Sequence, residues 1–216
     1  MFKRLRADIR AAKKNDPAAR SKFEIWLTYS GVHALSWHRW AHFLYKIHLR
    51  LLARITSQFC KFMTGIEIHP AAKIAGGVFI DHGAGVVIGE TAEIEEGVVI
   101  YQGATLGGTG KEKGKRHPTI KKGAVISAGA KVLGGFTVGE YAKIGAGAVV
   151  LKEVPPYATV VGVPGMVVRV NGEKIKDNDL EQEKRDPVLE EICRLREKVF
   201  NLENKLNQIE KENKGQ

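Results

Sequence analysis

Residues 120–150 read IKKGAVISAGAKVLGGFTVGEYAKIGAGAVV, and an aliphatic residue recurs at every sixth position of this stretch. The recurring residues are Ile120, Ile126, Val132, Val138, Ile144 and Val150. The same spacing runs upstream through two further sets, Ile68, Ile74 and Ile80, then Ile88, Ile94, Ile100 and Leu106. A period of six fits neither an α-helix nor a hairpin sheet. It is typical of a solenoid in which each unit is one short strand and one corner.

Three such units, about 18 residues, make one triangular coil, so the repeated aliphatic residues point inward and stack on one another. The sequence therefore predicts a mainly β fold, a parallel β-helix, over residues 66–170. The period breaks at two places. The spacing from Ile80 to Ile88 is eight, two more than the repeat, and the spacing from Leu106 to Ile120 is fourteen, eight more than the repeat.

The chain has a different pattern on either side of the repeat. Residues 1–65 have apolar residues at helical spacing and predict an N-terminal helical domain. Within it, Asp16-Pro17 is a typical helix start, and Gly31 is expected to separate two helices. Residues 171–186 are polar and are expected to form a linker, and residues 187–216 carry an apolar heptad pattern that predicts a C-terminal helix. That helix could form a coiled coil with other copies or pack on the chain's own body.

The chain of 216 residues has a formal net charge of +10, and the excess lies in the N-terminal segment, where residues 1–60 carry 12 Lys and Arg against 3 Asp and Glu. Such a segment could bind nucleic acid, an anionic membrane or a polyanionic ligand, or be a solvated helical surface. We favour the solvated surface and expect no nucleic-acid and no membrane partner. Two distant cysteines, Cys60 and Cys193, with no signal peptide and no apolar run of about 18 residues, indicate a cytoplasmic protein.

Residues with catalytic chemistry are concentrated where the repeat breaks, because an excursion from a rigid solenoid must serve something other than stacking. Asp81-His82 lies in the first break, and His82 is our candidate general base, since histidine titrates near neutral pH. Glu67, fifteen residues earlier, could reach this corner and orient the imidazole. A single histidine is more often a hydrogen-bonded surface residue, but the position of His82 in the break favours a catalytic role.

The second break, GGTGKEKGKRHPT at residues 107–119, ends in Arg116-His117. The planar guanidinium of Arg116 is suited to a carboxylate. Asp81 would complement an ammonium group, so the two breaks together could hold an amino acid. Gly107-Gly108 would bring backbone N–H groups close to a ligand, as an oxyanion site requires, or merely let the loop leave the coil.

The stretches IEIHPAAKI, IDHGAGVVIGETAEI, TLGGTGKEKGKRHPTI, AKIGAGAVV and VVGVPG together resemble the serine acetyltransferase family, with the likeness covering residues 15–170. The resemblance implies a left-handed coil, acetyl transfer from acetyl-CoA to the hydroxyl of L-serine, and no permanently bound cofactor or metal. It implies the following site residues: the base His82 with its orienting acid Glu67, the serine contacts Asp16, Asp81, Arg116 and His117, the backbone donor Gly108, and the acetyl-CoA contacts Ala128, Lys143 and Ala146. Where Glu67 stands the family has an aspartate, so this dyad is one methylene longer.

The resemblance also implies inhibition by L-cysteine in the serine pocket. The helical N-terminus is shorter than in hexameric members, so we expect a trimer of solenoids with active sites between subunits. Members that dock into O-acetylserine sulfhydrylase present a C-terminal isoleucine, whereas this chain ends in KENKGQ. We therefore do not expect that complex.

The mechanism expected is direct transfer through a ternary complex, because no serine or cysteine nucleophile stands in either break. Three other functions remain open at this point. A zinc hydratase would need three converging ligands, and His117 has no partner histidine a few residues on. A related transferase acting on a sugar or another amino acid, and a non-enzymatic trimeric scaffold, would share the same repeat.

Overall fold

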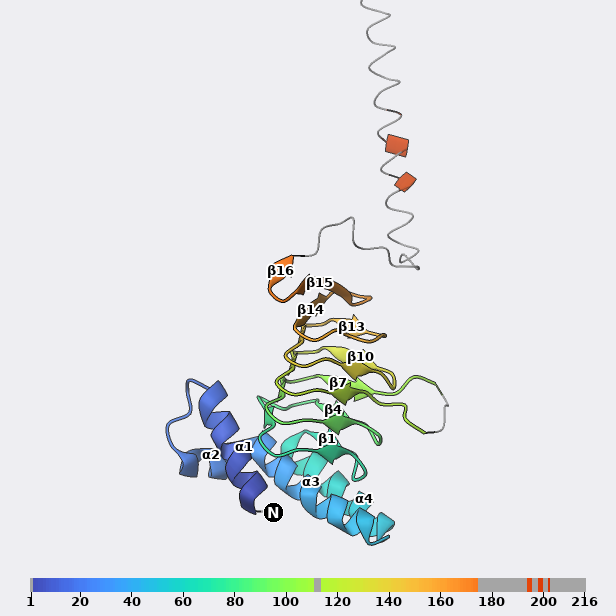
Figure 1. Ribbon diagram of the computed structural model, residues 1–216. Helices are drawn as coiled ribbons and strands as arrows, with labels where there is room; N and C mark the ends of the chain where they lie inside the picture. Colours follow the sequence, from blue (N-terminus) through green and yellow to red (C-terminus); the bar gives the residue numbers. More distant parts are fainter. Residues whose placement is uncertain (1, 111–113, 175–193, 196–197, 200–201, 203–216) are drawn as a thin grey trace, which may run out of the picture. The chain divides into compact units, whose positions relative to one another are not determined.

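The structure, a computed structural model, describes residues 2–110, 114–174, 194–195, 198–199 and 202. Residues 1–175 form one compact unit, in which helices precede a stack of short strands (Figure 1). The helices of this unit are α1 (Phe2–Asn15), α2 (Lys22–Thr28), α3 (Ser30–Lys46) and α4 (Arg50–Thr64). The solenoid begins directly after α4, whose C-cap residue Gly65 has a left-handed conformation.

The strands form three sheets. Each of the first four coils contributes one strand to each sheet, and the last coil contributes β13 and β14 to the first and third sheets. The first sheet contains β1 (Glu67–Ile68), β4 (Val87–Ile88), β7 (Thr105–Gly107), β10 (Lys131–Leu133) and β13 (Val149–Val150). The second contains β2 (Lys73–Ile74), β5 (Glu93–Ile94), β8 (Thr119–Ile120) and β11 (Thr137–Val138). The third contains β3 (Phe79–Ile80), β6 (Val99–Ile100), β9 (Val125–Ile126), β12 (Lys143–Ile144), β14 (Ala158–Val161), β15 (Met166–Val170) and β16 (Glu173–Lys174).

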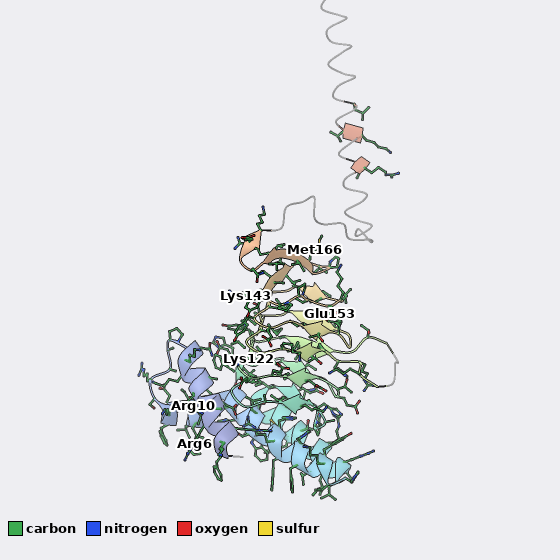
Figure 2. The ribbon with its side chains drawn as sticks, in the orientation of Figure 1. Arg6, Arg10, Lys122, Lys143, Glu153 and Met166 are labelled. Atoms are coloured by element: carbon green, nitrogen blue, oxygen red, sulfur yellow. The ribbon has the colours of Figure 1, made fainter. Side chains whose placement is uncertain are left out.

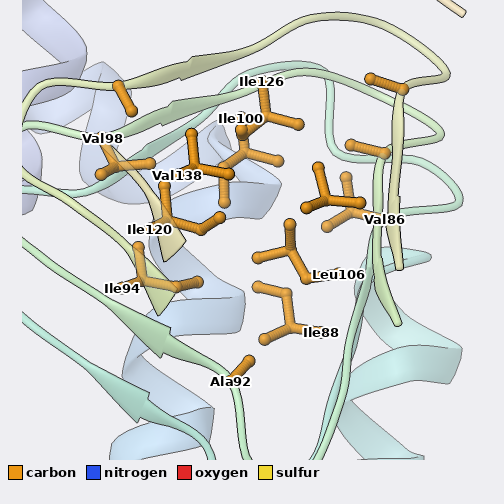
Figure 3. Close-up of a cluster of buried hydrophobic side chains, with 14 of the residues drawn as sticks. Val86, Ile88, Ala92, Ile94, Val98, Ile100, Leu106, Ile120, Ile126 and Val138 are labelled. Atoms are coloured by element: carbon orange, nitrogen blue, oxygen red, sulfur yellow. The ribbon is translucent and has the colours of Figure 1, made fainter. Parts of the chain in front are cut away.

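The aliphatic residues at six-residue spacing form the core, as the sequence predicts. Strands of consecutive coils pair in parallel, and the register aligns Ile68 with Ile88, Ile88 with Leu106, and Leu106 with Val132. These side chains are buried in one continuous core. Figure 3 shows Ile88 and Leu106 stacked in the interior of the solenoid, with Ile94, Ile100, Ile120 and Ile126 among the side chains around them. Each buried aliphatic side chain contributes about 1.5–3 kcal/mol relative to leaving it exposed, so the repeated stack is the main source of stability.

The corner between the third and first sheets, here called the first edge, consists of residues 81–86, 101–104, 127–130 and 145–148. Its coils are tied by backbone hydrogen bonds from Gly103 N to Ala84 O, from Gly129 N to Gln102 O, and from Gly147 N to Ala128 O, at 2.8–2.9 Å. These three glycines have φ between 67° and 69°. Glycine is required there because a left-handed backbone strains other residues.

The helical domain is fixed to the first coil by a buried carboxylate. Asp8 of α1 accepts a hydrogen bond from Gly77 N at 2.8 Å and lies 2.6 Å from Nη1 of Arg39 in α3. Burial raises the pKa of Asp8, and the Arg39 guanidinium acts in the opposite direction. Gly31 lies inside α3 and does not separate two helices as expected. A Cβ there would lie 2.2 Å from the carbonyl oxygen of Ile80, so glycine is needed for the close approach of α3 to β3.

Asp16-Pro17 does not start a helix, contrary to the expectation from the sequence. Asp16 directly follows α1, and its N–H still donates to Ala12 O at 2.9 Å. The next helix, α2, is capped instead by Ser21, whose Oγ accepts from Glu24 N at 3.0 Å. Ser21 and Glu24 have the spacing of a capping box, which indicates the start of this helix better than Asp16-Pro17 does.

The solenoid ends in an antiparallel hairpin and not in a further coil. Strand β15 pairs antiparallel with β14 and with β16. Regular structure therefore continues to Lys174, into the first residues of the predicted linker. The predicted linker and C-terminal helix otherwise lie almost entirely outside the described residues, and the heptad interpretation stays a prediction.

Candidate functional site

His82 lies on the first edge with its side chain open to solvent. Its φ is 55°, a left-handed conformation, and its side chain is 75% exposed. Its Nε2 lies 3.9 Å from Oδ2 of Asp81. The two residues inserted into the repeat produce this turn, which aims an imidazole outward from a rigid coil. A left-handed non-glycine residue stores backbone strain, and such strain is concentrated at functional sites.

Two carboxylates share a cavity of about 360 Å³ with His82. It lies between the helical domain and the first coil, and its lining residues are Asp16, Thr28, Tyr29, Ser30, Gly31, Ile80, Asp81 and His82. Asp16 and Asp81 therefore lie beside the imidazole although they are 65 residues apart in the sequence (81 − 16). Two carboxylates in one small cavity are suited to an ammonium group.

Tyr29 is a residue of this cavity that sequence reasoning missed. Its hydroxyl donates a short hydrogen bond to Oδ2 of Asp16. This bond lowers the pKa of Asp16 and raises the pKa of Tyr29 to about 12. Asp16 is thus held ionised and oriented toward the cavity.

The carboxylate of Glu67 contacts a lysine and not His82. Its Oε2 lies 2.6 Å from Nζ of Lys61 in α4, and the described residues contain no hydrogen bond between Glu67 and His82. The Lys61 and Glu67 side chains are 49% and 30% exposed. An ion pair this exposed contributes only about 0–1 kcal/mol, so it can be broken at small cost. Glu67 pairs in register with Val87, one coil below the strand that follows His82.

Arg116 and His117 lie on a different corner, the one between the first and second sheets, here called the second edge. Its described residues are 69–72, 89–92, 108–110, 114–118 and 134–136. Residues 108–110 leave the solenoid after β7, and residues 114–118 return to it before β8 (Figure 1). At this return, Arg116 forms a short ion pair with Oε2 of Glu90. His117 is 8% exposed, and its Nδ1 lies 3.0 Å from Oγ1 of Thr91.

Glu90 and Thr91 are two further residues that sequence reasoning missed. Both lie at the corner directly below the loop, in the stretch GETAEI. A signal was present: Thr91 and His117 are 26 residues apart, which equals one coil of about 18 plus the eight inserted residues. Burial, and then the adjacent Arg116 charge, lower the pKa of His117.

The remaining predicted residues divide between the same two edges. Gly108 is exposed on the second edge, and among the described residues no acceptor is recorded for its N–H. Ala128 and Ala146 lie on the first edge, one coil apart, and are linked by the Gly147 N to Ala128 O bond. Lys143 is an exposed side chain of β12 in the adjoining third sheet (Figure 2).

The structure therefore brings the predicted residues together in two groups. Asp16, Asp81 and His82 share one cavity on the first edge, in line with Ala128 and Ala146. Arg116, His117 and Gly108 form the second group, and the first sheet lies between the two edges. The cavity that contains His82 is not lined by Arg116, His117 or Gly108.

A second cavity, of about 670 Å³, contains none of the predicted residues. It lies between the helical domain and the second sheet, and most of its charged side chains are already paired, as in Lys73 with Glu93 and Lys122 with Glu96. Among the described residues, no group of three His, Cys, Asp or Glu side chains is placed to hold a metal ion. In the same part of the chain, none of the helices is both long enough and apolar enough to span a membrane. Arg6 and Arg10 of α1 belong to the basic N-terminal segment and are exposed (Figure 2).

Comparisons with known proteins agree on one family. Residues 117–152 match the family model "Bacterial transferase hexapeptide (six repeats)". The serine acetyltransferase of Bacillus subtilis strain 168 is 56% identical over 205 residues, which cover 95% of this chain and 94% of that protein. The serine acetyltransferase of Bacillus pumilus strain SAFR-032 is 57% identical over 205 residues, with the same coverage.

Solved structures of the same family superpose on this chain. A serine acetyltransferase in complex with cysteine has a TM-score of 0.78 at 44% identity, covering 80% of this chain and 68% of its own. The Neisseria gonorrhoeae serine acetyltransferase in complex with serine has a TM-score of 0.75 at 42% identity, covering 78% and 69%. A serine acetyltransferase in complex with CoA has a TM-score of 0.73 at 42% identity, covering 77% and 69%.

Proposed function

The chain belongs to the serine acetyltransferase family, and from this premise we propose how its two edges carry out the reaction. The enzyme transfers an acetyl group from acetyl-CoA to the hydroxyl of L-serine and forms O-acetyl-L-serine and CoA. The observation that carries the assignment of residues is the cavity in which Asp16, Asp81 and His82 meet. Its two carboxylates and one exposed imidazole match an amino acid whose hydroxyl must lose a proton.

In the proposed mechanism His82 is the general base. Its imidazole takes the proton of the serine hydroxyl, and the serine oxygen forms a bond to the thioester carbon. The tetrahedral intermediate collapses as the C–S bond breaks, and His82 returns the proton to the departing thiolate. The N–H of Gly108, which has no acceptor among the described residues, would donate to the oxyanion. No acetyl-enzyme is formed.

Glu67 is proposed to orient His82 once its ion pair with Lys61 opens. The ion pair is weak because both side chains are partly exposed, and a protonated imidazole is a competing cation for the same carboxylate. The extra methylene of glutamate, relative to the aspartate of the family, gives the carboxylate more reach. Lys61 would then hold Glu67 between turnovers.

We propose that a complete active site is formed between two copies of the chain in a homotrimer of left-handed solenoids. Within one chain the serine-binding carboxylates lie on the first edge, and Arg116 with His117 lies on the second edge. In a threefold arrangement the first edge of each copy can face the second edge of the next, which places Arg116 beside the serine carboxylate. Association is also supported by large apolar side chains left exposed on α4, among them Leu51 and Phe62.

Mixed trimers test this shared site. A His82→Ala chain and a His117→Asn chain, each inactive alone, are co-expressed with different tags and purified through both tags. If each site takes His82 from one copy and His117 from the next, about one third of the sites in every mixed trimer are intact. Activity close to that fraction of the native enzyme is expected. Activity no higher than that of either variant alone would place the whole site within one chain.

Acetyl-CoA is proposed to bind as a co-substrate along the first edge, and no cofactor is held permanently. Ala128 and Ala146 follow His82 on this edge, and small side chains there leave room for an extended ligand. Lys143 offers a positive charge to the polyanionic coenzyme. The CoA complex of a related enzyme supports this co-substrate.

L-Cysteine is proposed to inhibit by occupying the serine pocket, because it presents the same ammonium and carboxylate groups. The cysteine complex of a related enzyme supports this proposal. We further propose a cytoplasmic enzyme of cysteine biosynthesis.

The function is tested by measuring CoA release from acetyl-CoA with L-serine, with L-homoserine and with no acceptor. Rapid CoA release is expected with L-serine but not with L-homoserine or without an acceptor. The reason is that the pocket holds the ammonium and carboxylate of the substrate at a fixed distance from the base. Addition of L-cysteine is expected to raise the apparent KM for L-serine. Equal release with L-homoserine, or release that needs no acceptor, would contradict the assignment.

A further inference from the structure

We propose that Thr91 is a positioning residue that holds His117 as an imidazole with its proton on Nε2, so that His117 donates a hydrogen bond to the substrate. The proposal rests on the serine-binding role of His117 and deepens it. Neither the repeat nor the family resemblance assigns a function to Thr91. The hydroxyl group of Thr91 lies among three hydrogen-bonding partners at the end of the loop.

The Thr91 hydroxyl oxygen is occupied by two backbone donors. Oγ1 accepts from Arg116 N at 3.1 Å and from His117 N at 3.0 Å. A hydroxyl has two acceptor lone pairs and one proton to donate. With both lone pairs in use, its proton is left for the ring nitrogen His117 Nδ1, which lies 3.0 Å away.

A second donor reaches the same ring nitrogen. The backbone N–H of Thr91 donates to His117 Nδ1 at 3.2 Å. A nitrogen that accepts from two donors carries no proton itself, so the proton of a neutral imidazole must lie on Nε2. The low pKa of His117, caused first by burial and then by the Arg116 charge, favours the neutral ring.

The Nε2 side of the ring lies between two glycines. A Cβ on Gly89 would lie 1.9 Å from Cδ2 and 2.1 Å from Nε2 of His117, and a Cβ on Gly108 would lie 3.4 Å from Nε2. The imidazole thus fits only because Gly89 has no side chain. Among the described residues no acceptor is recorded for Nε2. An Nε2–H in this setting is therefore available to an oxygen atom of the substrate.

This arrangement divides the chemistry between two histidines. His82 is exposed and free to accept a proton, whereas His117 is a fixed donor and cannot serve as the base. Glu90 performs the parallel task for Arg116 by holding Nη2 of its guanidinium. Residues 90 and 91 together would position the pair that recognises the serine carboxylate.

The first measurement is the tautomer of His117 in the native enzyme. Histidine labelled with ¹⁵N gives distinct signals for protonated and unprotonated ring nitrogens, and a His117→Asn sample identifies the signals of His117. A neutral ring with the proton on Nε2 is expected at neutral pH. A proton on Nδ1 overturns the proposal, whether or not any variant folds.

The second measurement compares Thr91→Val, which removes the hydroxyl at constant shape, with Thr91→Ser, which keeps it. Thr91→Val is expected to raise the KM for L-serine about tenfold or more. Without the hydroxyl, the His117 ring and the backbone of Arg116 and His117 are no longer held in place. The KM for acetyl-CoA should change less than about twofold. Thr91→Ser keeps the hydroxyl, so its KM for L-serine should stay close to that of the native enzyme. Melting temperatures measured in parallel show whether Thr91→Val is folded.

The two measurements separate this proposal from the function on which it rests. If Thr91→Val folds and His117 keeps the Nε2 proton with unchanged mobility, the Thr91 hydroxyl does not position the ring, and the proposal, which rests on that hydroxyl, is overturned. If the tautomer is lost but the KM for L-serine is unchanged, Thr91 does position the ring. The serine-binding role of His117 is then the part that fails.

Discussion

Replacing His82 with alanine is expected to lower kcat for acetyl transfer to L-serine by roughly 10²–10⁴-fold, because a positioned general base contributes about that factor. His82 is the exposed imidazole of the cavity that also contains Asp16 and Asp81. The KM for acetyl-CoA should change little, since the thioester is bound by other residues. Steady-state rates of CoA release measure both constants.

The backbone at His82 requires a matched control. With φ at 55°, histidine already carries left-handed strain at this position, and alanine tolerates that conformation less well than histidine does, which has no bearing on proton transfer. Asparagine tolerates the left-handed conformation and offers no base. His82→Asn should therefore melt close to the native temperature and still lose kcat to the same extent.

Two outcomes would remove this mechanism. Near-normal turnover of His82→Asn would show that another group takes the hydroxyl proton. A stable acetylated protein, formed with acetyl-CoA in the absence of serine, would show a covalent intermediate and not direct transfer. Mass spectrometry of the native enzyme after such an incubation decides the second point.

The fold could be predicted because one spacing rule repeats along the chain. Every aliphatic residue from Ile68 to Val150 that the six-residue period placed inside the coil is buried. The rule holds because each coil rests on the previous one, so a residue's environment depends on its position within the coil. The helical domain has no such repeat, which is why Asp16-Pro17 and Gly31 were interpreted wrongly.

The site could be predicted only as far as the breaks in the repeat point to it. His82, Arg116 and His117 were found because they stand where the period fails. Their supporting residues Tyr29 and Thr91 were missed because they lie in stretches with no irregularity. Thr91 could have been found by counting one coil back from His117, whereas the contact of Tyr29 with Asp16 depends on how α2 and α3 pack.

The enzyme is expected to lose stability as the pH falls below about 6.5, and His38 in α3 is the main single cause. His38 is buried, and its pKa is lowered to about 3. Burial is the largest cause, followed by the positive charges that His42 and Arg39 place beside it, with a smaller effect from His69. A backbone hydrogen bond with Ala72 opposes the shift.

The sign of this effect follows from proton counting. Between pH 6.5 and about 3 the unfolded chain binds a proton at His38 and the folded chain does not. The free energy of unfolding therefore falls with falling pH in this window, by about 1.4 kcal/mol per pH unit from this residue. Above pH 6.5 both states hold a neutral His38, and the contribution is constant.

The measurement is the urea midpoint of the native enzyme and of His38→Gln at a series of pH values between about 8 and 4.5, at fixed protein concentration. Glutamine does not titrate, so the variant should start less stable but lose stability less steeply. The exposed His48, replaced by asparagine because its φ of 64° is left-handed, is the matched control and should keep the native slope.

The difference between the two slopes isolates His38 from the other titrating groups. Burial also lowers the pKa of His69 and His117, so both residues make the free energy of unfolding fall as the pH falls. The pKa of Asp8 is raised, so Asp8 has the opposite effect on the free energy of unfolding. All three are present in both proteins, so their effects cancel in the comparison. Parallel curves for the native enzyme and His38→Gln would mean that the folded chain accepts the proton at His38, and that Asp8 or a rearrangement of α3 compensates the charge.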